Sequence, residues 1–199
     1  MWRQGRRSVQ TAAAAPAYAR GDARRATIDR MLRVDHAGEY GAIRIYDGQM
    51  AVLGRGGDPA LSATLRQMKE QEREHLAALE RRMPERRARP SALLPIWGAA
   101  GYALGFGTAL LGKEAAMACT VAVEEVIASH YNDQLRDLMQ PAFDKEDDLR
   151  HLVAKHRDEE MEHRDIGIEH DALRAPAYQL LSTVIKTGCR AAIWISERV

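Results

Sequence analysis

Cysteine is scarce in this sequence, and the patterns that mark several common protein classes are missing from it. Its two cysteines among 199 residues, Cys119 and Cys189, form no CxxC pair, so neither a disulfide framework nor a thiolate zinc site is indicated. No glycine-rich dinucleotide fingerprint stands between a strand and a helix. No stretch alternates polar and apolar residues for long enough to suggest a sheet. The sequence therefore predicts one all-α domain with a substantial core.

Acidic residues are nearly absent from the first 25 positions, which hold six arginines and only Asp22. The net charge of the whole chain is +1, so removing this segment, which carries +5, leaves −4. An Arg-rich, Ala- and Ser-containing segment without a continuous apolar run is typical of a mitochondrial transit peptide and unlike a secretory signal. A disordered basic tail is the alternative. We expect residues 1–25 to be a leader outside the fold, and residues 26–199 to form the domain.

Helical periodicity covers most of the remaining chain. The expected helices span residues 27–53, 59–83, 113–139, 144–173 and 176–199, and the segment "GRGGDP" separates the first two. The last of them is amphipathic: apolar residues such as Trp194 supply one side, and Lys186 and Arg190 carry positive charge. That pattern fits either packing onto a bundle or attachment to a membrane surface.

Charge is absent from the 22 residues 91–112, "SALLPIWGAAGYALGFGTALLG". The count would suffice for a membrane span, but five glycines and Pro95 argue against one. A basic cluster of the kind that attracts anionic lipid headgroups precedes the stretch: Arg81, Arg82, Arg86, Arg87 and Arg89. We expect a helix lying in or against one membrane leaflet. A buried connecting helix and a true span are the alternatives.

Ionisable residues interrupt the apolar stripes of four helices. Stepping by four and three along residues 144–173 gives Leu149, Val153, His156, Glu160, His163, Gly167 and His170. The same stepping places an acid near the middle of each of the other three stripes, and on the second helix adds a histidine three residues later. Buried carboxylates and imidazoles are costly unless a cation compensates them. The predicted metal ligands are Glu39, Glu72, His75, Glu124, Glu160 and His163.

This order, E then ExxH and again E then ExxH, is the set with which ferritin-like bundles hold two irons or manganese ions. An offset of 85 residues relates Glu39 to Glu124, and one of 88 relates Glu72 to Glu160, so two hairpins look like copies of one unit. The predicted fold is a ferritin-like four-helix bundle made of two pseudo-repeated hairpins, with an apolar connecting helix and a C-terminal amphipathic helix added.

Several neighbours of these ligands are assigned lesser roles. Glu125 and Glu159 adjoin ligands but lie off the stripes, and Glu74 and Glu162 are expected to face away from the metals. We interpret three further stripe histidines either as residues that contact the ligands or as satisfied core residues. Two stripe tyrosines are expected either to pack in the core or to form hydrogen bonds with ligand carboxylates. These residues are His36, His156, His170, Tyr46 and Tyr131.

Six segments of the chain resemble the 5-demethoxyubiquinone hydroxylase family of coenzyme Q biosynthesis, over residues 27–199. They are "RVDHAGEYGA", "QMAVLG", "GTALLGKE", "AMACTVAVEE", "DEEMEHRDIG" and the terminal "SER". In that family the di-iron ligands are the Glu of HAGEYG, both residues of each ExxH, and the first Glu of VAVEE. On this chain those positions coincide with the six residues chosen from the stripes, and the resemblance implies no catalytic residue beyond them.

The resemblance implies an O₂-dependent monooxygenase that hydroxylates the ring of 5-demethoxyubiquinone at a di-iron centre. It also implies NADH as the reductant, at a binding site that the sequence does not assign. The implied location is the matrix side of the inner mitochondrial membrane, as a peripheral protein. Its implied partners are the lipid surface, a lipid-binding accessory protein and further copies of the chain, with no nucleic acid. The alternative is a ferritin-like iron-oxidising or iron-storage protein, which shares the ligand set.

Overall fold

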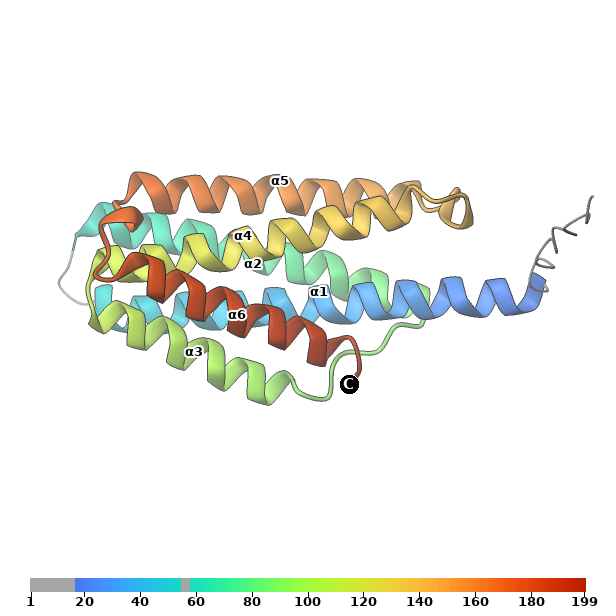
Figure 1. The fold of residues 1–199 in the computed structure, drawn as a ribbon, viewed down its shortest axis with the longest axis horizontal. Helices are drawn as coiled ribbons and strands as arrows, with labels where there is room; N and C mark the ends of the chain where they lie inside the picture. The colour runs from blue at the N-terminus through green and yellow to red at the C-terminus, as the bar shows by residue number, and fades with distance from the viewer. Residues whose placement is uncertain (1–16, 55–57) are drawn as a thin grey trace, which may run out of the picture.

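The computed structural model describes residues 17–54 and 58–199, and α-helices make up most of this part of the chain (Figure 1). The helices are α1 (Ala17–Leu53), α2 (Pro59–Arg86), α3 (Leu94–Leu110), α4 (Lys113–Leu138), α5 (Asp147–Glu169) and α6 (Tyr178–Ser196). Two short 3₁₀ turns, η1 (Pro141–Phe143) and η2 (Ala172–Arg174), flank α5. No strand occurs in the described ranges, so the all-α prediction is confirmed.

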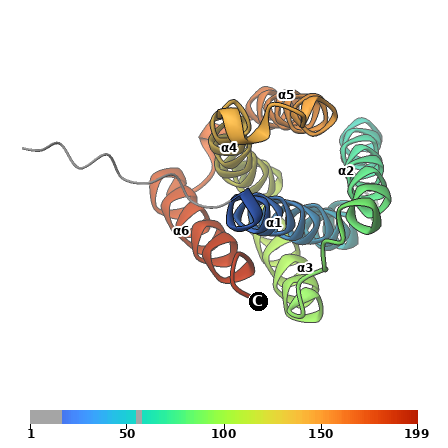
Figure 2. The ribbon, with the colours of Figure 1, turned by 90° about the vertical axis from the view of Figure 1, so that its right-hand side faces the viewer.

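Four of these helices form a bundle, and the other two cover one side of it. Seen end-on, α1, α2, α4 and α5 surround a common interior, while α3 and α6 lie outside it next to α1 (Figure 2). The apolar helix α3 packs mainly on α1, and the amphipathic helix α6 packs mainly on α4. This arrangement agrees with the predicted bundle and its two added helices.

The first helix begins ten residues before the predicted start at Thr27, inside the segment interpreted as a leader. Alanine and arginine are strong helix formers, which explains why α1 extends in this direction. Arg24 forms an ion pair with Glu146, a buried residue just before α5, so this part of the segment contacts the bundle. The remainder of the predicted leader, residues 1–16, lies outside the described residues.

The helix predicted at residues 144–173 is shorter than expected, and so is the last one. The fifth helix begins at Asp147, after the 3₁₀ turn that Pro141 opens. Beyond its end, Asp171 adopts a left-handed backbone conformation with φ 68°, and Ala177 does so with φ 48°. Both conformations interrupt a right-handed helix, and α6 therefore begins at Tyr178 rather than at residue 176.

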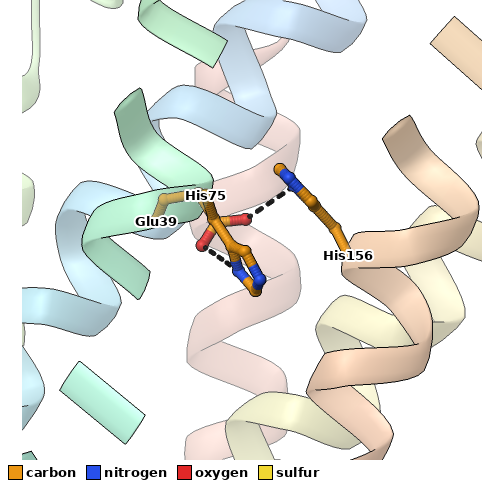
Figure 3. A group of neighbouring side chains, drawn as sticks. All are labelled: Glu39, His75 and His156. Atoms are coloured by element: carbon orange, nitrogen blue, oxygen red, sulfur yellow. Dashed lines mark ion pairs between the residues drawn. The ribbon is translucent and has the colours of Figure 1, made fainter. Parts of the chain in front are cut away.

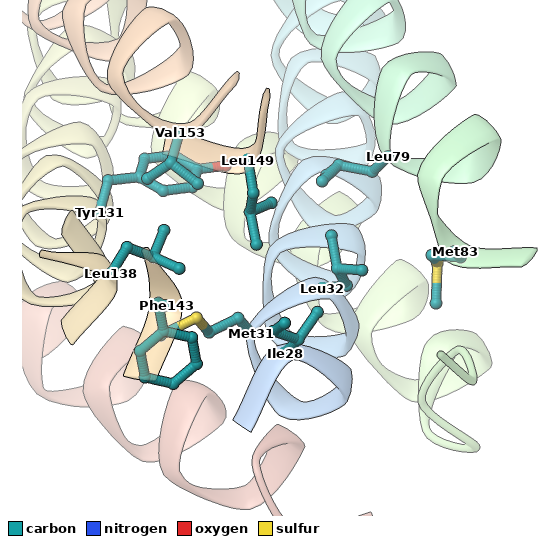
Figure 4. Close-up of a cluster of buried hydrophobic side chains, with 10 residues drawn as sticks. All are labelled: Ile28, Met31, Leu32, Leu79, Met83, Tyr131, Leu138, Phe143, Leu149 and Val153. Atoms are coloured by element: carbon teal, nitrogen blue, oxygen red, sulfur yellow. The ribbon is translucent and has the colours of Figure 1, made fainter. Parts of the chain in front are cut away.

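The interior has a polar layer between two apolar ones. Figure 4 shows the apolar cluster at one end, built from Leu32, Leu79, Leu149 and Val153 among others. Another cluster, around Leu65, Met68 and Val121, lies at the other end. Glu39, Glu72, Glu124 and Glu160 are buried along the same helix stripes between the two, as the stepping by four and three predicts.

The close contact between α3 and α1 explains the glycines of the apolar stretch. A Cβ atom on Gly105 would lie 1.9 Å from the backbone oxygen of Ile45, and one on Gly48 would lie 2.3 Å from the backbone oxygen of Tyr102. Only glycine allows the two backbones to approach this closely. One side of α3 is therefore held against the bundle, while Ile96 and Leu110 on this helix are exposed. None of the helices in the described ranges is both long enough and apolar enough to cross a bilayer.

Candidate metal centre

Four helices bring the six predicted ligands together in the polar layer. Glu39 comes from α1 and Glu124 from α4, whereas α2 and α5 each supply a glutamate and a histidine one turn apart. All six side chains are buried, with at most 3% of any residue exposed. Their ligand atoms form two groups, and within each group these atoms lie within 4.8 Å of one another. The groups are Glu39, Glu72, His75 and Glu160, and Glu72, Glu124, Glu160 and His163.

Glu72 and Glu160 belong to both groups, so each could bridge two metal ions. In the first group Nδ1 of His75 lies 3.3 Å from Oε2 of Glu39 and 3.3 Å from Oε1 of Glu160. In the second group Nδ1 of His163 lies 3.1 Å from Oε1 of Glu72 and 3.4 Å from Oε2 of Glu160. Two sites that share two carboxylates fit a pair of closely spaced cations, as in ferritin-like bundles.

Unsatisfied polar atoms show that the residues fit such a pair. Both oxygens of Glu72, Oε2 of Glu160 and Nδ1 of both ligand histidines are buried without a hydrogen-bond partner among the described residues. Buried polar atoms are rarely left in this state. Each one has lost its hydrogen bonds to water, and without a new partner this loss destabilises the fold. Carboxylate oxygens and imidazole nitrogens are ligand atoms for iron and manganese in helical bundles, so divalent cations would satisfy these atoms.

The pKa values of the metal-free site reflect the crowding of its charges. Burial raises the pKa of Glu72 to about 8, and the charge of Glu160 contributes to the same rise. Burial and the Glu160 charge also raise the pKa of Glu124 well above its usual range. Although burial acts in the opposite direction, contacts with the Glu160 and Glu72 carboxylates raise the pKa of His163 to about 11. Bound protons therefore compensate the negative charge of the carboxylates when no metal ion does so.

Two buried tyrosines contact the ligand carboxylates in a crossed pattern. The hydroxyl of Tyr46 on α1 donates to Oε1 of Glu124 on α4 at 3.3 Å. The hydroxyl of Tyr131 on α4 donates to Glu39 on α1. Each tyrosine thus orients the glutamate of the other hairpin. Both alternatives for these residues are confirmed, because each hydroxyl bonds to a carboxylate and each ring also packs in a buried apolar cluster.

The outer nitrogens of the ligand histidines have partners that the stripe pattern did not reveal. Nε2 of His75 lies 2.9 Å from Oε2 of Glu159, and Nε2 of His163 lies 3.0 Å from Oε1 of Gln71. Each partner directly precedes a glutamate ligand in the sequence. Because Gln71 and Glu159 lie off the apolar stripes, only the packing of α2 against α5 makes their contacts visible.

Among the other stripe histidines, His156 is the one nearest the ligands. Its ring stacks on that of His75 with 4.2 Å between centroids, and its Nδ1 lies 3.7 Å from Oε1 of Glu39 (Figure 3). Burial lowers the pKa of His156 to about 4, so its imidazole is neutral at pH 7. His36 instead faces Glu80 at 3.8 Å, and His170 lies at the C-terminal end of α5.

A cavity of about 410 Å³ leads to the carboxylates from the side that α3 and α6 cover. Its inner end is lined by Glu39, Glu72, Glu124 and Glu160. Its walls are mostly apolar and come from four helices: Ala42 and Ile45 of α1, Trp97 and Leu104 of α3, Val123 and Ile127 of α4, and Val184, Ile185 and Ile193 of α6. The site can therefore receive an apolar molecule directly beside the ligand carboxylates.

A small polar network borders this cavity. The side-chain amide of Gln134 donates to Oδ1 of Asp35 at 2.6 Å, and Nε2 of His130 lies 3.5 Å from the same oxygen. Burial raises the pKa of Asp35. Oδ2 of Asp35 and Nε1 of Trp97 are buried and have no hydrogen-bond partner in the described part of the chain. Both residues line the cavity, which leaves one acceptor and one donor for a bound molecule.

Comparison with known proteins gives one consistent result. A family model described as ubiquinone biosynthesis protein COQ7 matches residues 26–196. A human protein named NADPH-dependent 3-demethoxyubiquinone 3-hydroxylase, mitochondrial, is 56% identical over 175 residues, which cover 88% of this chain and 79% of that protein. A Rhodospirillum rubrum protein named 3-demethoxyubiquinol 3-hydroxylase is 54% identical over 174 residues, 87% of this chain and 79% of that protein. A Saccharomyces cerevisiae protein named 5-demethoxyubiquinone hydroxylase, mitochondrial, is 44% identical over 189 residues, which cover 89% of this chain and 81% of that protein. The chain belongs to the COQ7 family of ubiquinone biosynthesis proteins.

Proposed function

We propose that this chain is an O₂-dependent hydroxylase that adds one oxygen atom to the ring of a demethoxyubiquinone in ubiquinone biosynthesis. The observation that carries the proposal is the apolar cavity that ends at four buried ligand carboxylates. All three relatives above are named as hydroxylases of a demethoxyubiquinone or demethoxyubiquinol. Those names favour the enzyme over the iron-storage alternative.

In this proposal the six predicted ligands would hold two iron ions, with Glu72 and Glu160 available to both groups of ligand atoms. Four carboxylates carry four negative charges, which balance two divalent cations inside the bundle. Two neutral imidazoles beside carboxylates suit iron. Bound iron would supply the reductive activation of O₂, a chemistry that amino-acid side chains do not provide. The chain itself supplies the ligands, orients them through Tyr46 and Tyr131, and excludes water.

The cavity is the proposed binding site of the quinone ring. Val123, Ile127 and Ile185 give it apolar walls that suit a ring carrying an isoprenoid tail. Trp97 Nε1 can donate a hydrogen bond to an oxygen substituent of the ring, and Asp35 Oδ2 can accept one from a ring hydroxyl of the reduced quinol form, since neither atom has a partner elsewhere in the described residues. The tail would leave between α3 and α6, where apolar side chains continue to the surface.

Two pairs of neighbouring glutamates test the ligand assignment. Glu124 is buried in the second group, whereas Glu125, the next residue, forms an ion pair with Lys186 of α6. Glu124→Ala is therefore expected to lose iron and turnover, and Glu125→Ala to keep most of both. Glu160→Ala is likewise expected to lose more iron than Glu159→Ala, because Glu159 reaches the centre only through His75. Equal iron loss within either pair would contradict the assignment.

A peripheral position on the inner mitochondrial membrane, on its matrix side, is the proposed location. Exposed apolar side chains gather on α3, at its C-terminal end and on α6, beside the cavity: Ile96, Phe106, Leu110, Leu111, Leu180, Val184 and Trp194. The basic cluster before α3 is partly neutralised, because Arg82 pairs with Asp148 and Arg86 with both Asp148 and Glu146. We therefore expect apolar contacts to contribute more to lipid binding than the cluster does.

The import route, the reductant and the protein partners are proposed from the family resemblance and from the names of the relatives. The human and yeast relatives are named mitochondrial, which supports import through the Arg-rich leader. The proposed reductant is a reduced nicotinamide nucleotide: the family resemblance implied NADH, while the human relative is named NADPH-dependent. A lipid-binding accessory protein and a second copy of the chain are the proposed protein partners of α3 and α6. Light scattering of the purified chain, alone and with that accessory protein, tests both.

Expression in a yeast strain that lacks its own 5-demethoxyubiquinone hydroxylase tests the function in cells. The wild-type chain is expected to restore ubiquinone and to remove the accumulated demethoxyubiquinone, as measured by mass spectrometry of lipid extracts. Glu124→Ala is expected to do neither at equal protein level. Persistence of demethoxyubiquinone with folded, iron-loaded wild-type protein in mitochondria would contradict the proposal.

A further inference from the structure

The two ligand histidines differ in the residue that contacts their outer nitrogen. Both direct Nδ1 toward the shared carboxylates Glu72 and Glu160. On the opposite side of the ring, Nε2 of His75 meets the carboxylate of Glu159 at 2.9 Å, whereas Nε2 of His163 meets the amide oxygen of Gln71 at 3.0 Å. With Nδ1 as the metal-binding atom, each Nε2–H donates outward, to a charged acceptor in one case and to a neutral acceptor in the other.

The internal symmetry of the bundle shows that the two acceptors occupy equivalent positions. The 88-residue offset that relates Glu72 to Glu160 and His75 to His163 also relates Gln71 to Glu159. The two acceptors therefore occupy equivalent positions in the two hairpins, each contacts the histidine of the other hairpin, and their contact distances differ by only 0.1 Å. The hairpins differ here only in the terminal group of one side chain, which is a carboxylate in Glu159 and an amide in Gln71.

We propose that Glu159 and Gln71 make the two metal positions unequal, so that the ion bound by His75 is held more tightly than the ion bound by His163. A histidine that donates to a carboxylate is a stronger electron donor than one that donates to an amide. The inference rests on the proposed metal centre and adds an order of binding to it. Glu159 is a positioning residue, because it acts on the metal only through His75.

Lys155 does not cancel the charge of Glu159. Its Nζ lies 2.9 Å from Oε1 and 2.7 Å from Oε2 of this glutamate, one turn along the exposed side of α5. The Lys155 side chain is 60% exposed, so water screens the pair strongly. The Glu159 side chain is 23% exposed and makes its contact with His75 on the buried side. Lys155 thus offers a control that alters the surroundings of Glu159 without removing its contact with His75.

Titration of the metal-free full-length protein with Co²⁺ tests the proposal without any enzyme assay. Absorption bands of bound Co²⁺ report each binding step. The hyperfine-shifted N–H proton of a coordinated histidine reports which histidine binds the first ion. Two nearby cations also repel each other, so two separate steps in the wild type alone would not decide the matter. The comparison between variants decides it.

Glu159→Gln is expected to weaken the first binding step by about 10- to 100-fold and to shift the first N–H signal. Gln71→Leu is expected to leave that first step and its N–H signal unchanged and to weaken only the second step. Lys155→Gln, the control, should not weaken either step. The Glu159→Gln variant should fold, because the equivalent position already holds a glutamine, and circular dichroism of each variant verifies this.

A first step that withstands Glu159→Gln, or that Gln71→Leu weakens, would overturn the inference. In that case two bound Co²⁺ ions per chain would still support the proposed metal centre. Failure of the folded wild type to bind two Co²⁺ ions would contradict the metal centre itself, and with it the inference.

Discussion

The hydroxyl of Tyr46 in α1 donates a hydrogen bond to Oε1 of Glu124 in α4, 78 residues further along the chain, at 3.3 Å. Its counterpart after the 85-residue offset, Tyr131, donates in the reverse direction, from α4 to Glu39 in α1. These crossed bonds tie each hairpin to a proposed ligand of the other. The positions of the ligands therefore depend on the contact between the two halves of the bundle.

Removal of one crossed bond is expected to lower the stability of the metal-free protein. Tyr46→Phe leaves a buried carboxylate oxygen without its donor, which should reduce the free energy of unfolding by about 1–3 kcal/mol. Urea unfolding in the presence of a chelator measures this. Tyr102→Phe is the matched control, because Tyr102 is half-buried on α3 and lies away from the carboxylates. This variant should change the free energy of unfolding by less than about 0.5 kcal/mol. Equal effects of the two variants would contradict the structural role of the Tyr46 bond.

The metal-free protein is expected to become more stable as the pH falls from 8 to about 6.5. Glu72 has a folded-state pKa of about 8 against an ordinary value of 4.5, so in this window the folded state binds more protons than the unfolded state. The pKa of His163, raised to about 11 from 6.5, acts in the same direction. Below about 6.5 the lowered pKa of His156, about 4, acts against them.

Thermal melts in the presence of a chelator, at several pH values between about 8 and 5, measure this dependence. The melting temperature should rise toward pH 6.5 and then level off. A steady fall of the melting temperature over the first interval would show that the four carboxylates do not share protons in the metal-free bundle. Saturation with metal should flatten the rise, because cations replace the protons.

Filling the cavity should impair substrate binding without loss of iron. A Cβ atom on Gly41, which lines the cavity, meets no atom within 4 Å, so Gly41→Leu can extend into the open space. We expect KM for a short-tailed demethoxyquinone to rise by about 10-fold, equivalent to ~1.4 kcal/mol. Gly107→Leu is the control, since its Cβ also meets nothing but points to the exposed side of α3. Unchanged KM in Gly41→Leu would place the substrate elsewhere.

Binding to vesicles should depend on the apolar residues of α3 and α6. Leu110 and Trp194 are exposed by 64% and 57%, and replacing either with Glu should release the protein from vesicles that contain anionic lipid. Met161→Glu, on α5, is the control. High salt should release part of the wild-type protein, and a carbonate wash should extract the rest. Resistance to carbonate, or equal binding by all variants, would contradict peripheral attachment through this surface.

The sequence was sufficient to predict the bundle and the six residues that meet in its polar layer, because helical periodicity determines which side chains face inward. It also predicted correctly that Glu74 and Glu162 point to solvent. The acceptors Gln71 and Glu159 were not predicted as partners of the histidines, because they lie between the buried and the exposed sides. Their role depends on how α2 and α5 pack against each other, and the residue pattern of one helix does not predict that packing.

Neither the cavity nor the start of α1 could be predicted from the sequence, and the reasons differ. The cavity forms where α3 and α6 cover α1 and α4, and this depends on the close approach that Gly48 and Gly105 allow. The composition of the segment before residue 26 predicts a leader, while the helix-forming residues of this segment extend α1 back to Ala17. Composition thus indicated a leader but gave no information about the contact between Arg24 and Glu146.

Incorporation of labelled oxygen tests the central claim most directly. Purified protein is supplied with ferrous iron, a reduced nicotinamide nucleotide with a small electron carrier, ¹⁸O₂ and a short-tailed demethoxyquinone, and the product is analysed by mass spectrometry. The account predicts a hydroxylated ring that carries one ¹⁸O atom, and no such product with Glu124→Ala. Unlabelled hydroxylated product, or no product from wild-type protein that holds two irons per chain, would contradict it.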